Sequence, residues 1–406
     1  MKRKEETSMS DFKARHIIEA LRSGVPSRAV GEYFSEARPE IMKKISDSLE
    51  TVRECGRSGG MIYTGRYGEG KTHLLNTVFS MATTSNMVVS FVPLGKETPL
   101  DKLHLLFPKI IANTYLPGAM QPGFRPALEE LTPGSSISNE LLAYAAKELE
   151  TDKLYYLLRA FLGTQDDDER MAFLADLEGD FVAAQVVKKS YKAVTGMTAK
   201  FNQSFSKTKH AMDYFHFTSH LFQKLGYDGW VILLDEAELI GRLGKKTRMK
   251  TYSAMQKFLN PEPSLENVFT LFSFSSSYVE DVIDKRNEFD SVKEVFAQQP
   301  EDRKAAEKSL NDIIHAPELL PLTRNEIRNI LLSIEQFHGR AYDWSPEISE
   351  ETIYSATQAG GYLLRTQIRA AIEFLDQLYQ YGEAGKTRIT ELGKEILDEQ
   401  EVPKLY

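Results

Sequence analysis

The segment Gly65-Arg66-Tyr67-Gly68-Glu69-Gly70-Lys71-Thr72 limits the folds open to this 406-residue chain more than any other feature. It matches the pattern G-x-x-x-x-G-K-[ST], in which the glycines let backbone N–H groups curl around phosphate oxygens. The apolar run Met61–Thr64 precedes the segment and predicts a buried strand, and His73–Met81 follows it and predicts a helix. This order predicts a phosphate-binding loop, because the helix directs its positive end at the phosphates.

The loop pattern also assigns roles to individual residues. Lys71 is predicted to place a positive charge at the β- and γ-phosphates of ATP, and Thr72 to offer its hydroxyl to Mg²⁺. Nucleotide contacts are predicted for Gly65, Arg66, Tyr67, Gly68, Glu69, Gly70, Lys71, Thr72 and His73.

Two acidic residues, Asp235 and Glu236, follow the apolar run Val231–Leu234 directly. A buried strand that ends in two acids places carboxylates at the carboxyl edge of a sheet, where ligands bind in open α/β sheets. Asp235 is predicted to hold Mg²⁺, and Glu236 to polarise the attacking water. The alternative for the pair is a solvated acidic turn, and Glu238 is interpreted as an acid at a helix start.

Hydrophobic periodicity divides the rest of the chain into an α/β core and helical segments. Strands are predicted at Met61–Thr64, Met87–Val92, Trp230–Leu234, Val268–Phe274 and Glu318–Leu322. Helices are predicted at Phe12–Arg22, Pro39–Arg53, His73–Met81, Leu103–Asn113, Ser138–Leu149, Lys153–Phe161, Phe181–Val194, Thr247–Leu259, Arg324–His338, Ser349–Ala359, Tyr362–Tyr381 and Thr387–Glu399. The predicted domains are an N-terminal helical segment packing on the core (1–58), the core (59–96 and 226–322), a helical insertion (97–225) and a C-terminal helical lid (323–406).

Composition excludes several classes of protein. The net charge of −8 lacks the basic excess of a DNA-coating protein, so any contact with DNA depends on a local patch or on partner proteins. The single cysteine, Cys55, excludes an internal disulfide and favours the cytoplasm. No apolar run approaches the ~20 residues needed to cross a bilayer, so no membrane association is expected. The histidines show no metal-ligand spacing.

Two clusters of basic residues are candidates for contacting DNA or a neighbouring subunit, and the alternative for both is a solvated helix face. The first contains Lys188, Lys189, Lys192, Lys200, Lys207 and Lys209. The second contains Arg242, Lys245, Lys246, Arg248 and Lys250. The aromatic residues near the first cluster are predicted to be core residues rather than platforms for stacked bases.

The chain resembles AAA+-like P-loop ATPases and, more narrowly, the ATP-binding proteins of BREX-type bacterial phage-defence systems (the BrxC/BrxD ATP-binding family). The resemblance is carried by Ile17–Pro26, Gly65–Leu75, Ile232–Glu238 and Gly360–Arg365. It implies an α/β fold: a parallel-sheet P-loop NTPase (AAA+-like) core with a large helical insertion and a C-terminal helical lid. It also implies ATPase activity with ATP and Mg²⁺.

The resemblance implies two further site residues. Ser275, at the end of the strand after the acidic one, is the candidate sensor of the γ-phosphate; a serine-rich turn is the alternative. Arg365, at the start of a lid helix, is the candidate that reaches the phosphates, with Arg369 as the second choice and a surface ion pair as the alternative. The sequence departs from the family pattern in lacking a clear arginine finger, for which Arg286 and Arg303 are the weak candidates.

The function expected from these features is ATP hydrolysis by a component of an antiphage defence system. ATP would drive assembly or action on DNA together with partner proteins, a helicase or a nuclease. DNA and a second copy of the chain remain open as partners. The alternatives are an ATP-gated scaffold with slow turnover and a DNA ATPase of the initiator or helicase-loader type.

Overall fold

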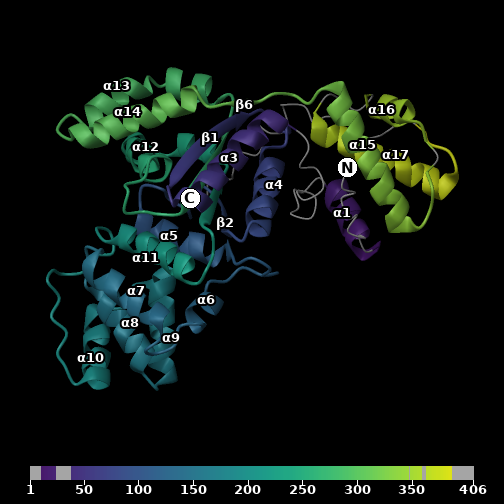
Figure 1. Ribbon diagram of the computed structural model, residues 1–406. Helices are drawn as coiled ribbons and strands as arrows, with labels where there is room; N and C mark the ends of the chain where they lie inside the picture. Colours follow the sequence, from purple (N-terminus) through teal and green to yellow (C-terminus); the bar gives the residue numbers. More distant parts are fainter. Residues whose placement is uncertain (1–10, 24–37, 347, 359–362, 386–406) are drawn as a thin grey trace, which may run out of the picture. The chain divides into compact units, whose positions relative to one another are not determined.

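In the computed structural model, residues 11–23, 38–346, 348–358 and 363–385 are described here (Figure 1). They form two compact units. The first unit is built from the described parts of residues 1–39, 66–78 and 319–406, and the second from residues 40–65 and 79–318. No described helix combines the length and the apolar content that crossing a bilayer requires.

A six-stranded sheet has the strand order β3-β2-β4-β5-β1-β6, and β2, β4, β5 and β1 run parallel to one another. The strands are β1 (Gly59–Gly65), β2 (Val88–Pro93), β3 (Thr114–Tyr115), β4 (Trp230–Asp235), β5 (Val268–Ser275) and β6 (Glu318–Leu319). The predicted parallel α/β fold class is therefore confirmed. β6 is shorter than the predicted strand Glu318–Leu322, because Pro321 has no N–H group to donate to a ladder.

Gly59 and Gly60, which interrupt the helical pattern in the sequence, belong to β1. Gly60 lies against the last turn of α12 (Lys245–Leu259), where a Cβ atom would be 2.5 Å from the carbonyl oxygen of Phe258. Only glycine lets the strand and the helix approach this closely. The other helical elements around the sheet are α3 (Pro39–Cys55), α4 (Lys71–Thr84), η2 (Ala237–Arg242), η3 (Val279–Asp284), α13 (Glu288–Val295) and α14 (Pro300–Ile314).

Between β2 and β4 the chain forms a mostly helical region, as predicted from the sequence. Its elements are α5 (Leu103–Ala112), β3, α6 (Arg125–Glu129), α7 (Ser136–Lys147), α8 (Lys153–Gly163), α9 (Asp167–Ala175), the π-helical turn η1 (Asp176–Asp180), α10 (Ala184–Thr195) and α11 (Ala211–Lys224). Figure 1 shows α5 and α11 next to the sheet and α7 to α10 beyond them. The apolar residues of this helical region and those of the sheet form one hydrophobic core.

Three local predictions in this region differ from the structure. α10 begins at Ala184 rather than at Phe181, because the backbone at Phe181 is left-handed (φ 51°). α11 was not predicted as a helix, because its residues are buried on almost every side and show no single apolar stripe. β3 adds a short antiparallel strand to the edge of the sheet within a region predicted to be helical.

In the first unit, α1 (Asp11–Ser23) packs with α15 (Arg324–Tyr342), α16 (Glu350–Gln358) and α17 (Leu364–Tyr381) around a separate core. Ala14, Ile17 and Ile18 of α1 are fully buried there. The predicted segment 1–58 is thus divided, because α1 buries its apolar stripe against C-terminal helices while α3 belongs to the second unit. Gly24–Pro26, Gly360–Tyr362 and the predicted helix Thr387–Glu399 lie outside the described residues.

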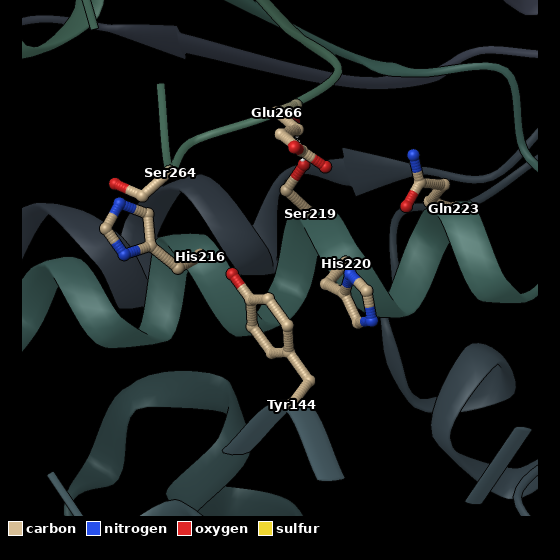
Figure 2. Close-up of a pocket in the computed structure, with 7 residues that line it drawn as sticks. All are labelled: Tyr144, His216, Ser219, His220, Gln223, Ser264 and Glu266. Atoms are coloured by element: carbon tan, nitrogen blue, oxygen red, sulfur yellow. Dashed lines mark hydrogen bonds between the residues drawn. The ribbon is translucent and has the colours of Figure 1, made fainter. Parts of the chain in front are cut away.

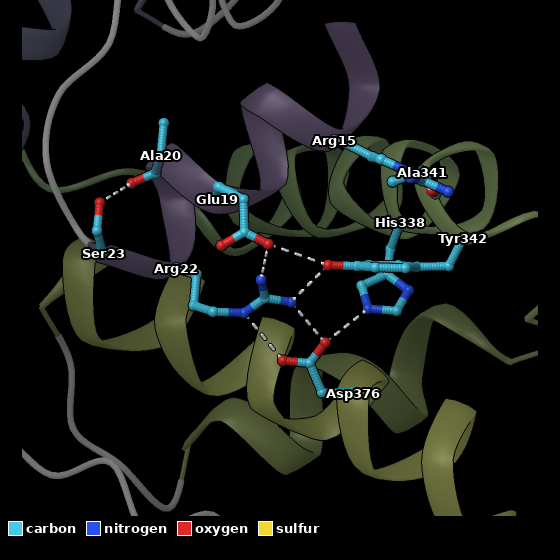
Figure 3. A network of polar contacts seen from close by, with 9 residues as sticks. All are labelled: Arg15, Glu19, Ala20, Arg22, Ser23, His338, Ala341, Tyr342 and Asp376. Carbon is cyan, nitrogen blue, oxygen red and sulfur yellow. Dashed lines mark hydrogen bonds and ion pairs between the residues drawn. The ribbon is translucent and has the colours of Figure 1, made fainter. Parts of the chain in front are cut away.

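Polar contacts fix α1 on these helices (Figure 3). Arg22 donates to both carboxylate oxygens of Asp376 at 3.1 and 2.7 Å and to the hydroxyl of Tyr342 at 3.0 Å. His338 bonds to the same carboxylate through Nε2 at 3.0 Å. The network joins the N-terminal helix to α15 and α17, more than 300 residues away in the sequence.

Candidate nucleotide-binding site

In the second unit, the ends of three parallel strands meet at the carboxyl edge of the sheet. Gly65, the last residue of β1, is in register with Ser275, the last residue of β5. The backbone N–H of Ser276 donates to the carbonyl of Gly65 at 3.2 Å. β4 ends at Asp235, which is in register with Pro93 of β2. The carboxyl edge of parallel strands is the usual ligand site of an α/β sheet.

Asp235 and Glu236 differ in exposure and backbone conformation. Asp235 is 5% exposed, and its Oδ1 accepts a hydrogen bond from the N–H of Glu236 at 2.9 Å. Glu236 is exposed and has a left-handed backbone (φ 55°), which is uncommon for a residue other than glycine. Glu238 lies in the first turn of η2, as the sequence predicts for a helix-start acid. One carboxylate is thus held at the strand end, and the next is offered to solvent.

The predicted phosphate loop belongs to the first unit from Arg66 onward, and it is joined covalently to β1 at Gly65. Gly68 and Gly70 have left-handed φ values of 81° and 91°, which a residue with a Cβ adopts only with strain. α4 begins at Lys71, directly after the loop. A turn that requires glycine, followed at once by a helix N-terminus, fits a bound phosphate chain.

The loop is braced by its own acid and by a neighbouring arginine of the first unit. The buried Glu69 carboxylate accepts a hydrogen bond from the N–H of Arg66 at 3.3 Å. The Arg38 guanidinium donates to the carbonyl of Glu69 at 2.7 Å, and the N–H of Arg38 contacts Glu326 at 3.4 Å. Glu326 forms the capping box of α15 with Thr323. Arg38 was missed in the sequence, because a lone arginine before Pro39 belongs to no motif.

The start of α17 lies against the same loop within the first unit. Nη1 of Arg365 is 3.5 Å from the hydroxyl of Tyr67. A Cβ atom on Gly68 would be 3.4 Å from the Leu363 side chain. The structure therefore brings the predicted lid arginine to the predicted loop, while Arg369 is half-buried one turn further along α17.

The remaining candidates have partners within the second unit. The Ser275 hydroxyl is 3.2 Å from the Ser277 hydroxyl, so these two side chains of the serine-rich turn form a hydrogen bond with each other. Nη1 of Arg286 donates to the carbonyl of Gly241 at 2.7 Å. Nε of Arg303 pairs with Glu307 at 2.9 Å, one turn along the helix that begins at Pro300. Both finger candidates therefore form contacts within the chain.

A small polar pocket lies elsewhere in the second unit, between α7, α11 and the loop before β5 (Figure 2). It is lined by Tyr144, His216, Ser219, His220, Gln223, Ser264 and Glu266. Burial lowers the pKa of His220 to about 4 and raises the pKa of Tyr144, whose ring stacks on His220, to about 12. Glu266 precedes β5, so the pocket is at the amino edge of the strands, away from their carboxyl ends. No metal-binding cluster of three or more side chains occurs in the described part of the chain.

The comparison with protein families agrees with the pattern of the loop and the strand ends. The family described as "BREX system ATP-binding protein BrxC/D" matches residues 9–195 and 152–392. A solved structure, the Walker-type ATPase PABY2304 of Pyrococcus abyssi, is similar at 12% identity and a TM-score of 0.37, over 86% of this chain and 69% of that one. No curated protein matches the chain. Because the two family matches together extend over most of the sequence, the chain belongs to the BREX system ATP-binding protein BrxC/D family.

Proposed function

We propose that this protein binds ATP with Mg²⁺ at the loop Gly65–Thr72 and hydrolyses it. The observation that carries the proposal is the β1–loop–α4 unit, whose two left-handed glycines immediately precede a helix N-terminus. Such a loop offers backbone N–H groups and a helix dipole to phosphate oxygens. Family membership supports ATP as the nucleotide.

In this proposal, Lys71 neutralises charge at the β- and γ-phosphates. Thr72 and Asp235 would hold Mg²⁺, whose chemical contribution when bound is to neutralise charge that develops on the phosphates. The remaining loop residues and His73 would contact the nucleotide mainly through their backbone. Asp235 is 5% exposed and is the last residue of β4, so its carboxylate is held in place, as a metal ligand requires.

Glu236 is the proposed general base, which takes a proton from the attacking water. Its exposure and left-handed backbone support this role, because strained residues of this kind cluster at functional sites. Ser275 would sense the γ-phosphate from the end of β5, and Arg365 would contact the phosphates from the start of α17. The contact between Arg365 and Tyr67 supports the second assignment.

Turnover would alter assembly or action on DNA, together with the helicase or nuclease partners of an antiphage defence system. Leu363, packed against Gly68, couples the loop to α17, and α17 contacts α1 and α15. A second candidate function, an ATP-gated scaffold with slow turnover, is favoured by one observation. Both arginine-finger candidates, Arg286 and Arg303, are bonded within the chain.

Steady-state ATPase activity and equilibrium ATP binding separate the two candidates. We expect Lys71→Ala to abolish ATP binding, and Glu236→Gln to lower kcat by about 10²–10⁴-fold with ATP affinity within a few-fold of the wild type. Glu262→Gln, which changes an exposed acid after α12, is the matched control and should leave both quantities unchanged. Tight ATP binding by the wild type without turnover would favour the scaffold, and full activity of Glu236→Gln would refute its role as the base.

A further inference from the structure

The region between β2 and β4 separates its charges along the sequence. Residues 181–212 contain six lysines and no aspartate or glutamate, whereas the whole chain has a net charge of −8. The six lysines are Lys188, Lys189, Lys192, Lys200, Lys207 and Lys209. This contrast marks a local positive surface on an acidic protein.

α10 presents three of these lysines to solvent. Its buried residues, Val187, Ser190 and Tyr191, lie on the side that packs on α8, and Lys188, Lys189 and Lys192 are exposed. α10 also lies on the side of this region remote from the sheet (Figure 1). The lysines of α10, with Lys200 in the segment that follows, therefore form an outward-facing surface, which we call the lysine face: Lys188, Lys189, Lys192 and Lys200.

The segment after α10 is held in place on α8. The hydroxyl of Tyr156 donates to the carbonyl of Lys200 at 3.0 Å, and the N–H of Asn202 donates to Asp152 at 2.6 Å. Phe201 stacks on Tyr156 with ring centroids 5.2 Å apart, and Nζ of Lys188 is 4.6 Å from the Phe201 ring. The backbone that carries Lys200 is thus fixed before binding, so no loop has to be ordered when a ligand binds.

The second basic cluster has a different environment. Arg248 is buried and paired with Glu288, and Lys245 pairs with Glu294 at 2.5 Å. Among the first six lysines, Lys209 pairs with Glu150 at 3.7 Å. The four of the lysine face and Lys207 have no carboxylate within ion-pair distance in the described residues. Glu169 of α9 accepts a hydrogen bond from Ser190, which lies on the packed side of α10.

We propose that the lysine face binds the phosphate backbone of duplex DNA without reading its sequence. Lysines are point charges that suit phosphates, whereas lysine is depleted at protein–protein interfaces. The aromatic rings nearby are packed against one another, so they do not offer the free faces on which single-stranded bases stack. The proposed function includes action on DNA, and this proposal places the DNA on the lysine face. The binding does not require ATP.

Fluorescence anisotropy of a labelled 24-base-pair duplex of mixed sequence, measured without nucleotide between about 50 and 200 mM KCl, tests this directly. We expect the triple variant K188Q/K189Q/K192Q to weaken binding at least ~10-fold and to reduce the slope of log K against log salt by about 2–3, because each phosphate contact contributes about 0.9. K188R/K189R/K192R should bind as the wild type does. K245Q/K246Q/K250Q, which changes three exposed lysines of α12, is the matched control and should stay within a few-fold of the wild type.

The proposal is overturned if the wild type fails to bind the duplex at the lowest salt, or if both glutamine triple variants lose affinity equally. It is also overturned if poly-glutamate displaces the duplex as well as unlabelled DNA does, which would indicate an acidic protein segment as the partner. Circular dichroism and the urea midpoint check that each variant is folded. Because no nucleotide is present, DNA binding without ATPase activity would refute the proposed function alone, and ATPase activity without DNA binding would refute this proposal alone.

Discussion

The helices beside the sheet and the helices inserted between β2 and β4 each contain a buried ion pair, and the two pairs are built differently. Beside the sheet, Arg248 of α12 donates to both oxygens of Glu288 at 2.6 to 3.1 Å and to the carbonyl of Leu243 at 2.7 Å. In the insertion, Lys153 of α8 pairs with Asp176. Both carboxylates are fully buried.

The insertion pair is surrounded by aromatic groups. The hydroxyl of Tyr214 donates to Asp176 at 2.7 Å, and Nζ of Lys153 lies 3.2 Å from that hydroxyl and 4.2 Å from the Phe205 ring. Burial raises the pKa of Asp176 and lowers the pKa of Lys153, so both groups are pushed toward their neutral forms. An arginine cannot lose its proton in this way. The two regions should therefore respond differently when one partner is removed.

The largest effect is expected for Glu288→Gln. The change leaves the Arg248 charge buried without its carboxylate, and breaking a pair of this kind costs about 3–5 kcal/mol of the free energy of unfolding. Urea denaturation followed by circular dichroism measures the loss. The double change Arg248→Met with Glu288→Leu should recover most of it, because no buried charge remains. A loss below about 1 kcal/mol in the single variant would show that Arg248 is solvated after all.

Neither pair could be predicted from the sequence. Arg248 belongs to a basic cluster that favours a solvated face, and its partner Glu288 lies 40 residues away in another helix. Lys153 stands at the start of a predicted helix, where a charged residue is ordinary. Sequence periodicity shows that a helix has a buried side, but it does not show which distant residue that side meets.

The strand ends were predictable for the opposite reason. Gly65, Asp235 and Ser275 each follow an apolar run, so the residues themselves mark where each strand stops. A parallel sheet then places all three ends at one edge. Arg38 and the packing of α1 on α15 and α17 were out of reach, because both depend on contacts between segments far apart in the chain.

A smaller effect, with a distinctive dependence on pH, is expected for Asp176→Asn. The free energy of unfolding of the variant should fall by about 1–3 kcal/mol at pH 7. The amide of asparagine is a weaker partner for Lys153 than the carboxylate is, but it can still accept the hydrogen bond from Tyr214. Without the attraction of Asp176, the pKa of Lys153 falls further below its ordinary value. Above that lowered pKa the folded variant holds a neutral lysine, so its deficit against the wild type should shrink as the pH rises.

Urea midpoints of the wild type, Asp176→Asn and Glu288→Gln at pH 7 and pH 9 test this contrast. The deficit of Glu288→Gln should stay constant, because Arg248 keeps its proton throughout this range. Equal narrowing in both variants would contradict the distinction between the two pairs. Constant deficits in both would show that Lys153 stays charged in the absence of Asp176.

The smallest effect is expected for His220 of α11. Among the described residues, every histidine whose burial lowers its pKa lies in the insertion and none lies in the helices around Arg248. Burial lowers the pKa of His220 to about 4, below the ~6.5 of an unfolded histidine, with Lys224 acting in the same direction and Glu140 opposing it. The unfolded state therefore binds the proton more tightly, and stability is lost as the pH falls from about 6.5 toward 4. Asp213, whose pKa burial raises to about 6, has the opposite effect on stability as the pH falls, and it does so equally in the wild type and in the variants that retain it.

His220→Gln should consequently lose less stability than the wild type between pH 7 and pH 5 in urea unfolding. His315→Gln, at an exposed site after α14, is the control that should follow the wild type. If His220→Gln also follows the wild type, the acid sensitivity of the insertion does not arise at His220.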